Sequence, residues 1–201
     1  MILAGLASLR ERGPLPREGF ELRPPLELEY VLALERSHEV RLPESYRNFV
    51  LQVGDGGAGP HHGLWPLHRS ARWVGHGPPY GPGYLAIPFP FTTRVPAECF
   101  DELDDDGDYD DVLTGSMIIT EIGCGAFFRL IVTGPASGQV WRDEVSVGGA
   151  LVPGPDFGEW YLSWLRGVGA VKGTPTGRRR RLADWHSSSL VYRGPGSEQG
   201  R

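Results

Sequence analysis

Two segments near the start of the chain carry apolar side chains at helical spacing. The first runs from Leu26 to Arg36; its opening residues also alternate as a strand would, but its length and the Pro24-Pro25 pair before it favour a helix. A clearer helix begins at Leu42-Pro43 and places apolar side chains at i, i+3, i+4 and i+7, namely Tyr46, Phe49, Val50 and Val53. The Gly54-Asp55-Gly56-Gly57 run should end this helix.

The middle of the chain has the patterns typical of strands. Two short, proline-containing pieces, residues 63–67 and 84–89, suit the edges of a sheet. The strongest signal predicts strands joined by short glycine-rich turns, at residues 117–122, 126–133 and 139–142. Phe128, Leu130 and Val132 share one face of the second of these strands. We therefore expect an antiparallel meander at the centre of a sheet.

A last amphipathic helix is predicted from Asp156, which suits the N-cap position. Its apolar stripe should lie against the sheet and consists of Phe157, Trp160, Tyr161, Trp164 and Leu165. Helices, then strands, then a helix predict an α+β fold: a single domain with a mainly antiparallel sheet packed by helices. We assign residues 1–23 to an N-terminal extension, 24–166 to this domain, and 167–201 to a basic, Gly/Ser/Pro-rich tail expected to be flexible.

Composition places the chain among globular proteins. Hydrophobic residues make up 40% and charged residues 22% of its 201 residues. No apolar run approaches the ~20 residues of a membrane helix, and the start of the chain does not resemble a signal peptide. Cys99 and Cys124 form no disulfide framework, and we expect them to be free, buried thiols. These features predict a cytoplasmic protein, and its strong preference for arginine over lysine points to bacteria.

The net charge of −5 is unevenly distributed. One segment holds eight carboxylates and no base: Asp101, Glu102, Asp104, Asp105, Asp106, Asp108, Asp110 and Asp111. Such a cluster favours a basic partner and repels nucleic acid, so we interpret it as a partner-binding segment. A solvated loop and a weak divalent-cation site remain alternatives, but an EF-hand is excluded because Leu113 stands where a bidentate glutamate is needed. Only the Arg178–Arg181 run in the tail could contact nucleic acid, and a solvated tail is the simpler interpretation.

Other motifs give little support for catalysis or for a bound metal. Residues 54–59 match G-x-G-x-x-G, but a helix precedes them, so a helix-ending loop is favoured over a dinucleotide site. His61, His62 and His68 lack companion ligands and are expected to be exposed. Trp65 and Trp73 lie in Gly/Pro-rich connections, where each is either a local plug, which we favour, or an exposed anchor for a partner. We predict no enzyme activity, no cofactor and no metal.

Taken together, these pieces resemble the SUKH superfamily of cell-wall-assembly regulators and bacterial toxin-immunity proteins. The resemblance covers roughly residues 24–166. It rests on the order and spacing of Leu42-Pro43 with its aromatic helix, the glycine-rich end of that helix, Gly63-Leu64-Trp65, Gly138-Gln139-Val140-Trp141, and the aromatic helix from Phe157 to Leu165. The stretch from Ser70 to Pro82, the acidic segment and the tail do not match the shared pattern.

The resemblance implies a non-enzymatic protein-binding module. We expect an immunity protein that neutralises a cognate toxin, such as a basic nuclease domain, by direct binding. The candidate contacts are the eight carboxylates together with Trp65 and Trp73. Two alternatives stay open: a regulatory or scaffold protein tethered through its arginine-rich tail, and an enzyme of a class that the motifs do not identify.

Overall fold

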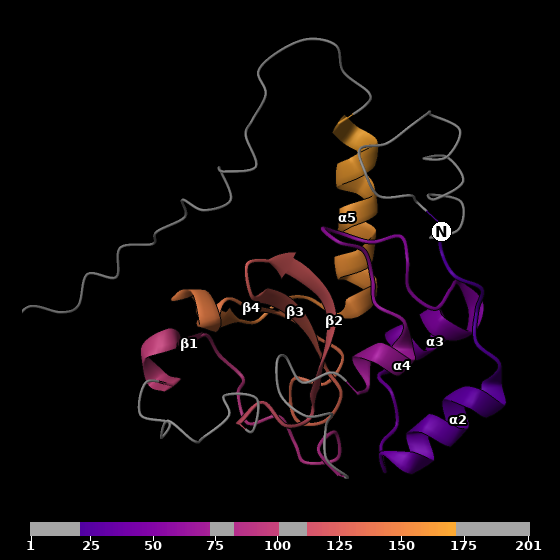
Figure 1. The fold of residues 1–201 in the computed structure, drawn as a ribbon, viewed down its shortest axis with the longest axis horizontal. Helices are drawn as coiled ribbons and strands as arrows, with labels where there is room; N and C mark the ends of the chain where they lie inside the picture. The colour runs from indigo at the N-terminus through magenta and orange to yellow at the C-terminus, as the bar shows by residue number, and fades with distance from the viewer. Residues whose placement is uncertain (1–20, 73–82, 101–111, 172–201) are drawn as a thin grey trace, which may run out of the picture.

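The computed structural model describes residues 21–72, 83–100 and 112–171 (Figure 1). The helices before the sheet are α2 (Leu28–Ser37), α3 (Glu44–Gln52) and the single turn α4 (Leu67–Ser70). The strands are β1 (Val95–Pro96), β2 (Ser116–Gly123), β3 (Ala126–Ile131), β4 (Val140–Asp143) and β5 (Ala150–Val152). Two 3-10 turns lie between strands: η1 (Ala97–Phe100) follows β1, and η3 (Val145–Val147) follows β4. Helix α5 (Phe157–Val171) follows the sheet.

The strands form one antiparallel sheet in the order β1-β5-β4-β3-β2. This architecture confirms the predicted α+β fold, and strands β2, β3 and β4 are the predicted meander. The glycines on either side of Cys124 allow the β2–β3 turn, in which Cys124 itself has a φ of 55°. Within the described residues no helix has the length and apolar character that crossing a bilayer requires.

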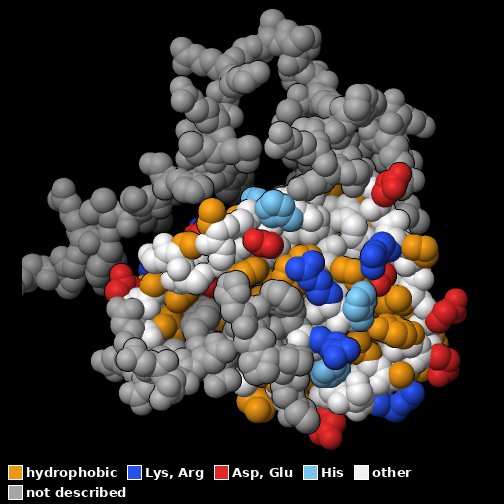
Figure 2. Space-filling model, viewed as in Figure 1, with side chains coloured by type: hydrophobic (Ala, Val, Ile, Leu, Met, Phe, Trp, Pro, Cys, Tyr) orange, Lys and Arg blue, Asp and Glu red, His pale blue; other side chains and the backbone are white. Residues whose placement is uncertain are grey.

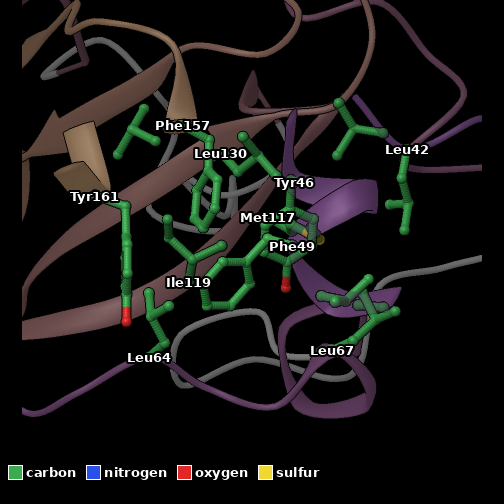
Figure 3. Close-up of a cluster of buried hydrophobic side chains, with 14 of the residues drawn as sticks. Leu42, Tyr46, Phe49, Leu64, Leu67, Met117, Ile119, Leu130, Phe157 and Tyr161 are labelled. Atoms are coloured by element: carbon green, nitrogen blue, oxygen red, sulfur yellow. The ribbon is translucent and has the colours of Figure 1, made fainter. Parts of the chain in front are cut away.

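The two faces of the sheet carry separate cores. The first core lies between one face and helices α2, α3 and α5, and it includes Met117, Ile119, Leu130 and Val140 from the strands (Figure 3). Phe128 and Val132 contact the same cluster, as the alternation along β3 predicts. The second core lies on the other face and consists of Phe89, Val95, Leu113, Ile131, Ala136, Trp141 and Leu151. The sheet is therefore buried on both sides.

Helices α3 and α5 are joined at their first turns. Asp156 caps α5, because one carboxylate oxygen accepts a hydrogen bond from the Gly158 amide at 2.8 Å. Its other oxygen accepts a hydrogen bond from the Ser45 hydroxyl of α3, also at 2.8 Å. The predicted cap is confirmed, and the same carboxylate fixes how the two helices meet.

The two edge strands predicted at residues 63–67 and 84–89 are wrong. The amides of Ala86 and Ile87 donate to the Gly83 carbonyl, so this piece forms a turn instead of a ladder. In the other piece the Trp65 amide donates to the carbonyl of Ile119 on β2, but at Leu67 the chain already enters α4. Apolar side chains in short pieces report burial, and burial does not by itself distinguish a strand from a turn.

Three further details differ from the sequence-based picture. Cys99 and Cys124 are free as expected, but both are exposed rather than buried. The ordered contacts begin before residue 24, since the Ala58 amide donates to the Glu21 carbonyl at 3.0 Å. Helix α5 continues to Val171, past the expected boundary at residue 166.

Candidate functional site

The residues on either side of the acidic segment pack against the second core. Its eight carboxylates, from Asp101 to Asp111, lie outside the described residues, as does Trp73. The described chain stops at Phe100 and resumes at Val112, and both side chains pack against the second core. Those two attachments fix where the acidic segment leaves and rejoins the domain.

A series of aromatic rings connects the sheet to the first attachment. Trp141 of β4 is fully buried and lies edge-on to Phe89, with ring centroids 5.0 Å apart. Phe89 contacts Phe91 at 5.6 Å, and Phe91 contacts Phe100 at 5.9 Å. Edge-to-face aromatic pairs hold a defined relative orientation, so Phe100 is positioned from the rigid centre of the sheet.

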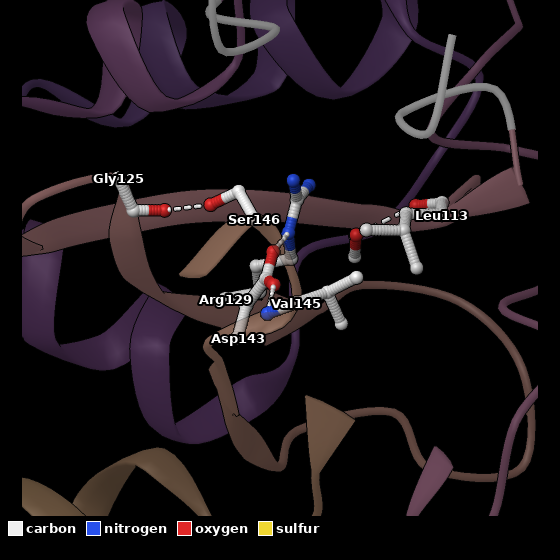
Figure 4. Close-up of polar contacts among 7 residues, drawn as sticks. Leu113, Gly125, Arg129, Asp143, Val145 and Ser146 are labelled. Atoms are coloured by element: carbon white, nitrogen blue, oxygen red, sulfur yellow. Dashed lines mark hydrogen bonds and ion pairs between the residues drawn. The ribbon is translucent and has the colours of Figure 1, made fainter. Parts of the chain in front are cut away.

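The second attachment is equally firm. Leu113 is completely buried in the second core. Its carbonyl accepts a hydrogen bond from the buried Ser116 hydroxyl at 2.6 Å, at the point where β2 begins (Figure 4). The described chain before the acidic segment therefore ends in the 3-10 turn η1, and the chain after it reaches β2 through the short turn 113–115.

A buried ion pair lies on the same face of the sheet. The Nε atom of Arg129 donates to a carboxylate oxygen of Asp143 at 2.6 Å, and both side chains are 2% exposed (Figure 4). The other oxygen of Asp143 accepts from the Val145 amide at 3.3 Å, which ties η3 to β4. This pair was not predicted from the sequence. The available signal was a single arginine inside the apolar strand Ala126–Ile131, together with an aspartate at the end of β4.

Trp65 has the role of a local plug. Only 6% of its surface is exposed, and its ring contacts Phe127 with centroids 6.4 Å apart. The guanidinium carbon of Arg69 lies 3.6 Å from the centre of the Trp65 ring, which is cation–π geometry. The indole thus stabilises the junction between α4 and β3, in agreement with the favoured interpretation.

The three histidines near the glycine-rich loop, His61, His62 and His68, are exposed, as the sequence predicted. The ring of His61 lies tilted against that of Phe128, with centroids 5.7 Å apart. Among the described residues, no group of three or more histidine, cysteine or acidic side chains is arranged to hold a metal ion.

The glycine-rich loop after α3 has a structural role built around Asp55. A carboxylate oxygen of Asp55 accepts from the Leu67 amide, the first of α4, at 2.7 Å. Gly56 has a φ of 78°, and a Cβ there would lie 2.8 Å from the Leu64 carbonyl oxygen. The loop therefore folds against the segment that precedes α4, as a helix-ending loop.

Burial and the nearby Asp55 carboxylate raise the pKa of the Tyr46 phenol, which stays protonated at neutral pH.

Replacing Asp55 with alanine is expected to lower the free energy of unfolding by about 1.5–3 kcal/mol. The substitution leaves the buried Leu67 amide without its charged acceptor at the start of α4. Urea denaturation of the two proteins measures the difference. Glu44→Ala, which removes an exposed carboxylate near the start of α3, is the control and should cost less than about 1 kcal/mol. Equal costs for the two variants would contradict the role assigned to Asp55.

Comparison with known proteins gives one family. The model of the SMI1 / KNR4 family (SUKH-1) matches residues 25–163, which is most of the chain and all of the sheet. No curated protein and no solved structure matches the chain.

Proposed function

The chain belongs to the SMI1 / KNR4 family (SUKH-1), and from that premise we propose that it is a non-catalytic binding protein that neutralises a cognate bacterial toxin by direct contact. The observation that carries this proposal is the double attachment of the acidic segment. A run of eight carboxylates begins and ends on one buried core, at Phe100 and Val112. The two flanking residues, Phe100 and Val112, support the proposal because both pack against the same core.

Charge concentrated in this way suits a partner with a basic active-site surface. A nuclease domain is such a partner, because it binds the phosphates of its substrate with arginine and lysine side chains. Carboxylates presented from a folded domain would occupy that surface and exclude the substrate. They would also accelerate association at low salt, because opposite charges steer the encounter.

The compartment is part of the same proposal. Cys99 and Cys124 are free and exposed, and exposed thiols persist most readily in a reducing compartment. We therefore place the protein in the bacterial cytoplasm, where it would meet a toxin made in, or delivered to, the same cell.

Neutralising the acidic segment should slow association with the toxin. We expect the combined variant Asp104→Asn, Asp105→Asn, Asp106→Asn and Asp108→Asn to lower the association rate constant at least about tenfold at low salt. Surface plasmon resonance against a basic toxin domain encoded next to this chain measures the rate, and raising the salt should reduce the difference between the variant and the unmodified protein.

The matched control removes four carboxylates elsewhere: Glu27, Glu29, Glu44 and Glu159 are all exposed and lie at the start of α2, α3 or α5. Changing them to glutamine alters the net charge equally and should change the rate much less. Equal effects of the two sets would remove the acidic segment from the mechanism. A chain ending at Val171, which keeps α5 complete, should bind normally, whereas a scaffold tethered through its tail would lose its partner.

A further inference from the structure

A charged groove lies on the helical side of the domain, at the junction of α2 and α3. It has a volume of about 530 Å³. Its walls are formed by the second half of α2, the segment that leads to α3, and one side chain of α3: Leu32, Glu35, Arg36, Glu39, Val40, Arg41 and Arg47. None of these residues belongs to the second core, so the groove is separate from the attachments of the acidic segment.

The base of the groove is fixed by Glu35. This carboxylate is buried, and its Oε1 atom accepts hydrogen bonds from the Leu42 amide and from Nε of Arg47, both at 3.0 Å. Nη2 of Arg47 approaches the other carboxylate oxygen at 3.4 Å. The two charges of this pair offset each other, and the pair joins α2 to α3. The base is thus rigid and electrically balanced.

The rim of the groove carries an excess of positive charge. Arg36 and Arg41 are exposed, and among the described residues neither lies within ion-pair distance of a carboxylate. Glu39 is the one acidic side chain of the lining besides the paired Glu35. Leu32 and Val40 are half-buried between these charges and supply apolar surface. Figure 2 shows basic, acidic and apolar side chains close together over the part of the molecule that contains α2.

We infer that this groove binds an acidic peptide segment of a partner protein. The two rim guanidinium groups pair with carboxylates of the peptide, and an aliphatic side chain between those carboxylates packs on Leu32 and Val40. The volume lies within the range of sites that hold small ligands or a few side chains. A peptide is favoured over a nucleic acid because the groove also offers the apolar surface of Leu32 and Val40, on which an aliphatic side chain can pack.

This inference does not rest on the proposed toxin. It predicts a second contact besides the acidic segment. The acidic segment would bind a basic surface of a partner, and the groove would bind an acidic segment of a partner. If one partner used both contacts, it would need a basic surface and an acidic segment together. That requirement would increase specificity as well as affinity.

The test uses the full chain and a fluorescein-labelled peptide in which one leucine stands between two pairs of glutamates. Fluorescence anisotropy at low salt should give saturable binding, and the same peptide with lysines in place of glutamates should not bind. Arg36→Glu with Arg41→Glu should raise the dissociation constant about tenfold. The control is Arg94→Glu with Arg166→Glu, which makes the same charge change at exposed positions outside the groove and should leave the constant within about twofold.

A second variant tests the apolar contact separately from the charges. Val40→Thr keeps the shape of the side chain but places a hydroxyl on the apolar part of the groove, and it should weaken binding while the net charge is unchanged. Thermal unfolding of each variant confirms that the fold is kept. Absence of saturable binding up to about 1 mM peptide, or equal weakening by the groove and control pairs, would overturn the inference.

Discussion

Replacing Asp143 with alanine is expected to lower the free energy of unfolding by about 3–5 kcal/mol. The carboxylate lies 2.6 Å from Nε of Arg129, and both side chains are 2% exposed. Removing it takes away the carboxylate that accepts from Nε of a buried guanidinium group, and a buried charge that loses a charged hydrogen-bond partner is costly. The loss also removes the acceptor for the Val145 amide, which connects η3 to the sheet. Urea denaturation followed by circular dichroism measures the change.

Two control variants separate the burial of charge from other effects. Arg142 at β4 and the adjacent Glu144 form a partly exposed ion pair, at 3.5 Å with side chains 38% and 26% exposed. Glu144→Ala should cost less than about 1 kcal/mol, because surface pairs contribute little. The double variant Arg129→Met with Asp143→Leu removes both buried charges and should recover most of the stability lost in Asp143→Ala. If the double variant is as unstable as the single one, packing rather than charge accounts for the loss.

Sequence periodicity predicted the long elements because each of them buries one side. Helix α3 places Tyr46, Phe49 and Val50 in the first core, as the i, i+3, i+4 spacing requires. Phe157, Tyr161 and Leu165 do the same for α5. A proline precedes α3 and an aspartate precedes α5. In both helices the residue at the start and the apolar spacing therefore predict the same element.

The short strands could not be predicted in the same way. Strand β1 has two residues and β5 has three, which is too few for alternation to be recognised. Their pairing depends on partners far along the chain, since Val95 of β1 lies opposite Leu151 of β5. Conversely, residues 84–89 have a strand-like composition but form a turn, because their apolar side chains fill the first and second cores from an irregular segment.

The charge of the candidate site was predicted from the sequence, but the core beside it was not. The acidic segment was identified in the sequence, but its attachment to a second core was not, because the sequence gives no direct sign that both faces of the sheet are covered. Arg129 was missed for a related reason. Its neighbours Phe128 and Leu130 pointed to one buried face, and a charged residue between them is ordinarily assigned to solvent. A sheet buried on both sides reverses that assignment.

The aromatic contact between α5 and α3 should be as important for stability as the buried ion pair. Phe157 is completely buried, and its ring lies 4.9 Å from Tyr46 and 5.2 Å from Phe49 by centroid, in edge-to-face contacts (Figure 3). We expect Phe157→Ala to lower the free energy of unfolding by about 3–5 kcal/mol, because the cavity would open inside a closely packed core. Chemical denaturation gives this value.

Tyr30→Ala provides the matched control, since it also removes an aromatic ring from a helix but at a site that is 44% exposed. We expect it to cost less than about 1 kcal/mol. Phe157→Leu should fall between the two, because leucine fills most of the space that alanine leaves empty. Comparable losses in Phe157→Ala and Tyr30→Ala would mean that α5 does not pack against α3 in solution. Because Phe157 lies in the first core and the residues flanking the acidic segment pack on the second, Phe157→Ala should leave the salt-dependent association rate attributed to the acidic segment unchanged under conditions in which the variant remains folded.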